Sequence, residues 1–147
     1  MKTIVALVDL SDLSFKVLKQ AHALATAFKS EVVILHVVPK EPVVVDVGLV
    51  SPTVMRAPSP GSVQVQYEQL EEMRESLMKF GVKARVEQFP GAEVDTVLEE
   101  ISRLGAELVI VGSHHHSRIY NLLIGSVSND VLMRAKCPVL VVPGGEG

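Results

Sequence analysis

The chain has 147 residues, of which 48% are apolar, which is enough for one globular domain with a buried core and short for two. Its net charge is -3 and it has no block of Lys or Arg, so it lacks the basic surface of a nucleic-acid-binding protein. It contains no Trp and only 4% aromatic residues, so it also lacks a platform on which bases could stack. The sequence has neither an apolar run of the roughly 20 residues that a membrane helix needs nor a signal-peptide pattern. Its single cysteine, Cys137, fits a reducing compartment. We therefore expect a soluble, cytoplasmic protein without a membrane partner.

Five short runs rich in Val and Ile predict β-strands. In chain order they are TIVALV from Thr3, EVVILHVV from Glu31, VKARVEQF from Val82, ELVIVG from Glu107 and CPVLVV from Cys137. Several of these runs are apolar almost throughout, which is typical of strands in a parallel sheet with helices on both faces.

The segments between these strands have the period of amphipathic helices. Their apolar faces are Val17, Ala21, Leu24 and Phe28 in the first; Leu70, Met73, Leu77 and Phe80 in the second; Val94, Val97, Leu98, Ile101 and Leu104 in the third; and Val127, Val131 and Ala135 in the last. Alternating strands and helices closed by a fifth strand predict an open, doubly wound α/β sheet with right-handed crossovers. Five strands are too few for an eight-stranded barrel.

The connection between the second strand and the second helix, residues 39–61, is unusually long. It holds five prolines, and its apolar sequence VVVDVGLVSPTVM has no clear helical period, so we expect a long Pro-rich loop. Such a loop is usually a lid, a binding loop or a mobile excursion. Its apolar residues could instead cover a neighbouring subunit, and the sequence does not decide between these alternatives.

The ends of the first and fourth predicted strands are candidate ligand sites, because open α/β sheets bind ligands beyond the carboxyl ends of their strands. Asp9 follows the first strand and precedes Ser11 and Asp12, either of which could cap the first helix. Asp9 itself could form a turn or accept hydrogen bonds from a ribose, and these two roles stay open.

The loop after the fourth strand begins at Gly112 and ends at Gly125-Ser126, where the last predicted helix starts. A helix N-terminus of this kind offers backbone N–H groups and a hydroxyl to phosphate oxygens. Ser126 could equally be a helix cap and nothing more.

This loop resembles the signature of nucleotide-binding members of the universal stress protein family, which is Gly, two residues, Gly, nine residues, then Gly followed by Ser or Thr. Gly112 opens the pattern, His115 stands where the second Gly belongs, and Gly125-Ser126 closes it. The stretches TIVALVDLSDLS, VVILHVV and CPVLVVP are similar to the first, second and last strands of the family, so the resemblance covers the whole chain.

The resemblance implies a five-stranded parallel sheet of order 3-2-1-4-5 and, as ligand, ATP or another adenine nucleotide, with Mg²⁺ held mainly by its phosphates. Asp9 would contact the ribose or adenine, Val37 would pair with adenine through its backbone, and the glycines would let the backbone approach the phosphates. The residues implied to bind the nucleotide are Leu7, Val8, Asp9, Val37, Gly112, His115, Gly125, Ser126, Val127 and Ser128.

His115 departs from the family pattern. A Cβ in place of glycine costs about 1 kcal/mol where a positive φ is needed and also narrows the space for phosphates. AMP or ADP would need less of this loop than ATP, and the imidazole could donate a hydrogen bond to a phosphate. The alternative is a family member that binds no nucleotide and acts through protein contacts.

Other functions find less support in the sequence. The adjacent side chains of His114, His115 and His116 point apart in a strand or a helix, so only an irregular turn could gather two around a metal. His22 and His36 are expected to be structural. No nucleophile elbow, zinc-protease motif, phosphate loop or dinucleotide fingerprint occurs, and no general base can be assigned for slow ATP hydrolysis.

The resemblance also implies a homodimer. The last predicted strand would lie at an edge of the sheet, where an apolar strand invites pairing with a second copy. The residues expected at this contact are Val139, Leu140, Val141 and Val142.

Overall fold

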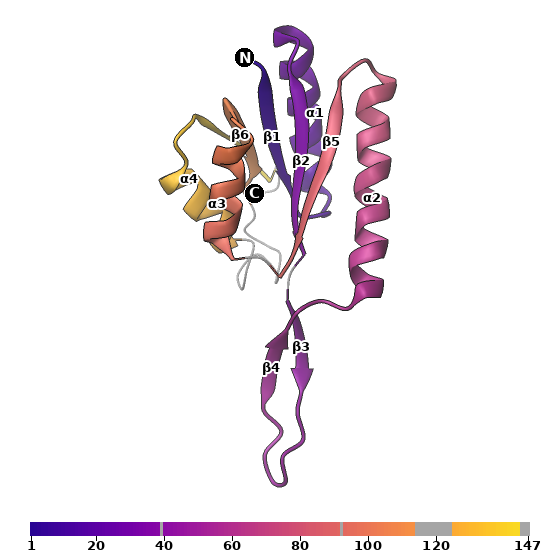
Figure 1. Cartoon of the computed structure of the whole chain (residues 1–147), viewed down its shortest axis with the longest axis vertical. Helices are drawn as coiled ribbons and strands as arrows, with labels where there is room; N and C mark the ends of the chain where they lie inside the picture. The colour runs from indigo at the N-terminus through magenta and orange to yellow at the C-terminus, as the bar shows by residue number, and fades with distance from the viewer. Residues whose placement is uncertain (39, 92, 114–124, 145–147) are drawn as a thin grey trace.

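The strands predicted from the apolar runs form one parallel sheet in the computed structural model of the chain (Figure 1). The structure describes residues 1–38, 40–91, 93–113 and 125–144, and of residues 125–129 the backbone alone. The strands are β1 (Thr3–Val8), β2 (Glu31–Val38), β5 (Ala84–Pro90), β6 (Leu108–Gly112) and β7 (Val139–Val142). Their order is β5-β2-β1-β6-β7, which is 3-2-1-4-5 when counted over the five predicted strands, so the predicted fold is confirmed.

Within the described residues, four helices cover the two faces of this sheet. They are α1 (Leu13–Phe28), α2 (Pro60–Lys79), α3 (Val94–Arg103) and α4 (Gly125–Arg134). Successive side chains of β1 enter two separate cores: Ile4 and Ala6 are buried with residues of α1 and α2, whereas Val5 and Leu7 are buried with residues of α3 and α4. Burial on both faces explains why the central strands are apolar without alternation.

Among the side chains that the structure describes, the predicted apolar faces of the helices are buried or partly buried except at two helix ends. Val17 of α1 and Leu70 of α2 are buried as expected. Phe28 is 51% exposed and Phe80 is 68% exposed, although the helical period assigned both to apolar faces. Phe28 is the last residue of α1 and Phe80 is the C-cap of α2, and at these termini the core beneath the helix ends.

Residues 39–61 differ from the predicted loop. Most of them form an antiparallel hairpin of β3 (Glu41–Val44) and β4 (Thr53–Arg56), which extends away from the sheet beyond the carboxyl end of β2 (Figure 1). Two backbone hydrogen bonds, from Val45 to Pro52 and from Val47 to Val50, continue the pairing to a tight turn. Gly48 has a φ of 72° at the first central position of that turn, as a type II′ hairpin turn requires.

The remainder of this segment starts α2 earlier than the hydrophobic period indicated. Ser59 is the N-cap residue, and its hydroxyl oxygen accepts a hydrogen bond from the backbone N–H of Ser62. Pro60 follows at the first helical position, where its missing N–H and fixed φ are favourable.

Candidate functional site

The centre of the sheet has the geometry of a ligand-binding edge. β1 pairs with β2 on one side and with β6 on the other, and all three are parallel, so their carboxyl ends lie at the same edge of the sheet. From there the chain enters α1 on one face after β1 and α4 on the opposite face after β6. This divergence is the switch point at which open α/β sheets bind ligands.

Asp9 lies at this edge, directly after β1, and its carboxylate is held by a hydrogen-bonded turn. Its Oδ1 accepts hydrogen bonds from the backbone N–H of Ser11 at 2.9 Å, from the Ser11 hydroxyl at 2.5 Å and from the Ser14 hydroxyl at 3.1 Å. Its own backbone N–H donates to the Ser14 hydroxyl at 3.3 Å. The carboxylate is therefore oriented before any ligand arrives.

This turn replaces the helix cap that the sequence predicted. Asp12 occupies the N-cap position of α1, but it has helical backbone angles and its side chain makes no capping hydrogen bond. Ser11 donates its hydroxyl to Asp9 instead of capping the helix. Leu10 takes a left-handed φ of 66°, which lets the chain leave the strand and reverse into α1.

His36 is a buried neighbour of this carboxylate that the sequence assigned only a structural role. It lies opposite Val8 in the β1–β2 ladder, and its side chain is 1% exposed. Burial lowers its pKa to about 4, and the negative charge of Asp9 opposes part of that shift. Gln88 of β5 lies within 3.4 Å of the His36 Nδ1 and can donate to it, so the imidazole is neutral near pH 7.

The edge is completed by the chain that follows β7. Ser113, just after β6, donates its backbone N–H to the Val142 carbonyl at 2.9 Å, and its hydroxyl accepts from the backbone N–H of Gly144 at 3.2 Å. Lys16 of α1 donates from its Nζ to the Gly144 carbonyl at 3.3 Å. No local sequence pattern predicts that Lys16 and Gly144, 128 positions apart, meet beside the end of β6.

The residues of β1 and β2 that the resemblance implies contact the base, Leu7, Val8 and Val37, divide between the two faces of the sheet. Leu7 and Val37 belong to the core beneath α3 and α4, whereas Val8 belongs to the core beneath α1 and α2. Leu7 and Val8 are both buried, while Val37 is partly exposed near the end of β2. The side chains of Leu7 and Val37 can thus face one ligand together, and that of Val8 points the other way.

The predicted phosphate-binding residues are described only in part. Gly112 is the last residue of β6 and pairs with Val142. Gly125 begins α4 as predicted, and Ser126, Val127 and Ser128 are in its first turn, where the structure describes the backbone alone. His115 and the rest of the histidine run lie outside the described residues.

The described residues show neither a metal-binding cluster nor a membrane-spanning helix. Across residues 1–38, 40–91, 93–113 and 125–144, no three His, Cys, Asp or Glu side chains are grouped so that they could hold a metal ion. Within these same ranges, none of the helices has the length and apolar character that crossing a membrane requires.

Comparison with known proteins places the chain among relatives of one kind. The sequence profile of the Universal stress protein family matches residues 1–143. A universal stress protein of Methanocaldococcus jannaschii, MJ0531, is 34% identical over 96% of this chain and 81% of its own length. A second relative, YxiE of Bacillus subtilis, is 32% identical over 92% of this chain and 94% of its own length.

Solved structures agree with the sequence relatives. A universal stress protein in complex with cAMP has a TM-score of 0.68 at 26% identity, over 97% of this chain and 96% of that one. The universal stress protein of Archaeoglobus fulgidus in complex with dAMP has a TM-score of 0.66 at 21% identity, over 96% of each chain. Both of these proteins were solved with an adenine nucleotide.

Proposed function

This chain belongs to the universal stress protein family, and from that premise we propose that it binds an adenine nucleotide at the carboxyl edge of β1, β2 and β6. Nucleotide binding would make the protein a sensor or signalling module of the stress response, working in the cytoplasm as a single domain without nucleic acid or membrane as partner. The observation that carries the proposal is the carboxylate of Asp9, oriented at the switch point by Ser11 and Ser14. An oriented carboxylate at this position is a suitable acceptor for ribose hydroxyl groups.

The end of β2 supports an adenine contact through the backbone of Val37. Odd-numbered residues of β2 direct their backbone N–H and C=O groups at β1, as in the hydrogen bond from the Glu31 N–H to the Lys2 carbonyl. Even-numbered residues direct theirs at β5, as in the hydrogen bond from the Gly91 N–H to the Val38 carbonyl. In the register that pairs Val8 with His36, the residue of the β1 chain whose N–H would reach the Val37 carbonyl is Leu10. Leu10 has already left the strand, so the Val37 carbonyl is suited to accept a hydrogen bond from the adenine amino group.

The groups suited to phosphates lie at the β6 side of the same edge. Gly112 permits close approach of the backbone, the first turn of α4 provides N–H groups, and Lys16 adds a positive charge beside Ser113. We propose that the phosphates of AMP, ADP or ATP lie here, with Mg²⁺ bound by the phosphates when there are two or three. His115 would decide how many phosphates fit.

Titration calorimetry of Asp9→Ala tests this assignment, with Asp46→Ala as a matched control at an exposed acid far from the edge. Removing a charged acceptor of a ribose hydroxyl should weaken nucleotide binding by about 1.5–3 kcal/mol, or roughly 10- to 150-fold in Kd. Asp46→Ala should bind like wild type. Equal affinity of Asp9→Ala and wild type would place the nucleotide elsewhere.

The alternative, a member of the family that acts through protein contacts without nucleotide, is favoured by one observation. Residues 41–56 form a hairpin with exposed apolar side chains, which is the kind of surface that protein partners cover. A protein that gives no heat with AMP, ADP or ATP would support this second function.

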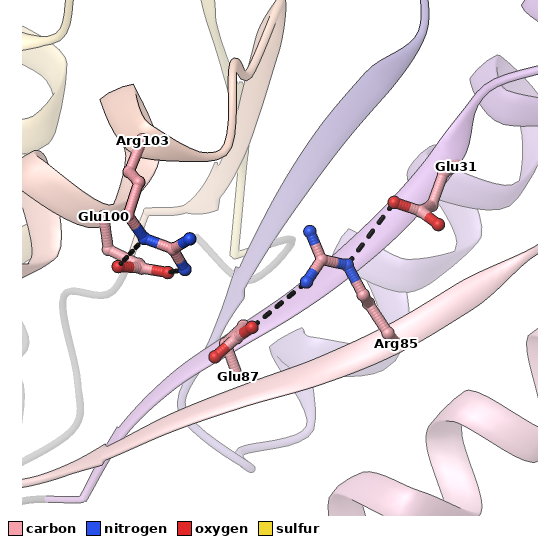
Figure 2. Close-up of polar contacts among 5 residues, drawn as sticks. All are labelled: Glu31, Arg85, Glu87, Glu100 and Arg103. Carbon is pink, nitrogen blue, oxygen red and sulfur yellow. Dashed lines mark hydrogen bonds and ion pairs between the residues drawn. The ribbon is translucent and has the colours of Figure 1, made fainter.

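We further propose that the protein is a homodimer paired through β7, because the two edges of the sheet differ in chemistry. The β5 edge is protected by charge: Arg85 pairs with Glu31 of β2 at 3.4 Å and with Glu87 at 3.2 Å (Figure 2). Arg103 of α3 pairs with Glu100 beside them and holds the pKa of that carboxyl below its usual value, with a smaller contribution from Arg85. Charged side chains of this kind prevent edge-to-edge pairing.

The β7 edge has no such protection among the residues that the structure describes. It consists of Val139, Leu140, Val141 and Val142, and within the described part of the chain β7 pairs with β6 alone. Val141 remains 39% exposed. A second β7 would cover these side chains and satisfy the outer backbone groups of the strand.

A further inference from the structure

The hairpin of residues 41–56, which we call the arm, carries about as much exposed apolar surface as the largest apolar patch of a typical monomer. Its exposed apolar residues include Val44, Val47, Leu49, Val50, Val54 and Met55, and Leu49 at the turn is fully exposed. Their exposed fractions together equal about four wholly exposed residues, on the order of 600 Å², which is the upper end for the largest apolar patch on a typical monomer.

The arm also lacks support from the body of the molecule. It extends beyond the end of the sheet, and both of its faces are apolar near the middle: Val43 pairs with Val54 on one face, and Pro42 pairs with Met55 on the other (Figure 1). A two-stranded hairpin without a packed face is marginally stable in water. The arm is therefore expected to be covered in the working protein.

The same chain carries an apolar groove, between α1 and α2 on the outer surface of the molecule. It has a volume of about 630 Å³, and its apolar lining consists of Leu10, Phe15, Leu18, Met73, Leu77 and Phe80. Phe15 is 65% exposed and Phe80 is 68% exposed, so both rings border open space. The ring of His22 packs edge-on against Phe80 with 6.1 Å between ring centroids, which holds the phenyl ring beside the groove.

We propose that the arm of one copy of this chain lies in the α1–α2 groove of a second copy. The area of the arm favours this occupant, because in a reciprocal exchange each copy would bury its own arm, about 600 Å², and the lining of its own groove, which together approach the roughly 800 Å² per partner of a standard stable interface. The groove has space for several aliphatic side chains of the arm turn, with Leu49 entering between the helices.

Charge and direction agree with the same pairing. Glu41 and Arg56 neutralise each other at the base of the arm, which leaves Asp46 near its turn. The groove is lined by Lys19 on its α1 side and by Glu72 on its α2 side, so Asp46 would face Lys19. Neither Asp46 nor Lys19 forms an ion pair within the described residues, so each can meet the other across the contact. The arm points away from the end of the sheet at which α1 and α2 begin, so two copies facing each other can exchange arms about a two-fold axis (Figure 1).

Sedimentation of the full chain tests the proposal, in a Val141→Asp background that removes the β7 contact proposed above. Leu49→Asp in the arm and Phe80→Asp in the groove should each weaken the remaining association at least tenfold. Phe28→Asp, a matched change at an exposed phenylalanine outside the groove, should leave it unchanged.

Mixing the two variants separates this contact from an arm-to-arm contact. Leu49→Asp retains an intact groove and Phe80→Asp an intact arm, so the mixture should form a heterodimer although neither variant associates alone. A Val141→Asp protein that is monomeric at every concentration would overturn the proposal. So would a Phe80→Asp variant that associates normally, or a mixture without heterodimer.

Discussion

Protonation of His36 should make the protein lose stability as the pH falls from 7 to 5. The imidazole is buried and neutral, with a pKa of about 4 in the folded protein against 6.5 in the unfolded chain. Between these two values the unfolded chain binds more protons, so stability falls as the pH is lowered. This difference in pKa lowers the free energy of unfolding by about 3 kcal/mol at pH 4, and about 2 kcal/mol of that loss occurs between pH 7 and pH 5.

Urea unfolding of wild type and His36→Leu at pH 7, 6 and 5 measures this effect. The variant lacks the titrating group, so its free energy of unfolding should fall by about 2 kcal/mol less than that of wild type over this range. Leu35→Val is the matched control, because it changes a fully buried, non-titrating side chain of the same strand and should retain the slope of wild type. Parallel pH profiles for wild type and His36→Leu would refute the assignment of this slope to His36.

Four further substitutions have expected outcomes of their own. Gly125→Asp should abolish nucleotide binding in calorimetry, because it puts a carboxylate among the phosphates. His115→Gly should strengthen binding of ATP. Unchanged affinity in both variants would contradict the assignment of the phosphate site. Val141→Asp at the β7 edge, made in a Leu49→Asp background that removes the arm contact, should convert dimer to monomer in sedimentation, and an unchanged mass would rule out pairing through β7. Leu70→Ala empties a fully buried position beneath α2 and should destabilise the protein by about 2–5 kcal/mol in urea unfolding; a loss under 1 kcal/mol would mean that this core repacks freely.

The fold could be predicted from the sequence because its main signals are local. Apolar runs such as EVVILHVV mark strands buried on both faces, and the helical period between them sets the crossovers. The strand order came from the resemblance to a known family, since periodicity alone does not specify which strands are neighbours.

The hairpin of residues 41–56 was not predicted, because prolines as frequent as those of residues 39–61 are typical of loops. The signal was present: β-branched residues flank Gly48 on both sides, and a glycine between two such runs indicates a hairpin turn. The turn at Gly48 then brings Val47 and Val50 together, and Pro42 and Pro52 are tolerated because neither strand lies inside a larger sheet.

The candidate site could be predicted in position but not in detail. The sequence predicts that Asp9 binds a ligand or forms a turn, and the structure shows the turn, with the carboxylate at the carboxyl edge of the sheet. The contact of His36 with Gln88 depends on the register of β2 against β5, and that of Lys16 with Gly144 on the packing of α1 against the end of β7. Such contacts join distant parts of the chain, and no local pattern encodes them.

Mass spectrometry of the small molecules released on denaturing the protein, after purification without added nucleotide, tests the central claim most directly. An adenine nucleotide released in near-stoichiometric amount from wild type, and lost from Asp9→Ala, is the predicted result. It would show that the edge formed by β1, β2 and β6 binds nucleotide with His115 in place. If no nucleotide is released and calorimetry with AMP, ADP and ATP gives no heat, the claim is contradicted, and the protein acts through its partners instead.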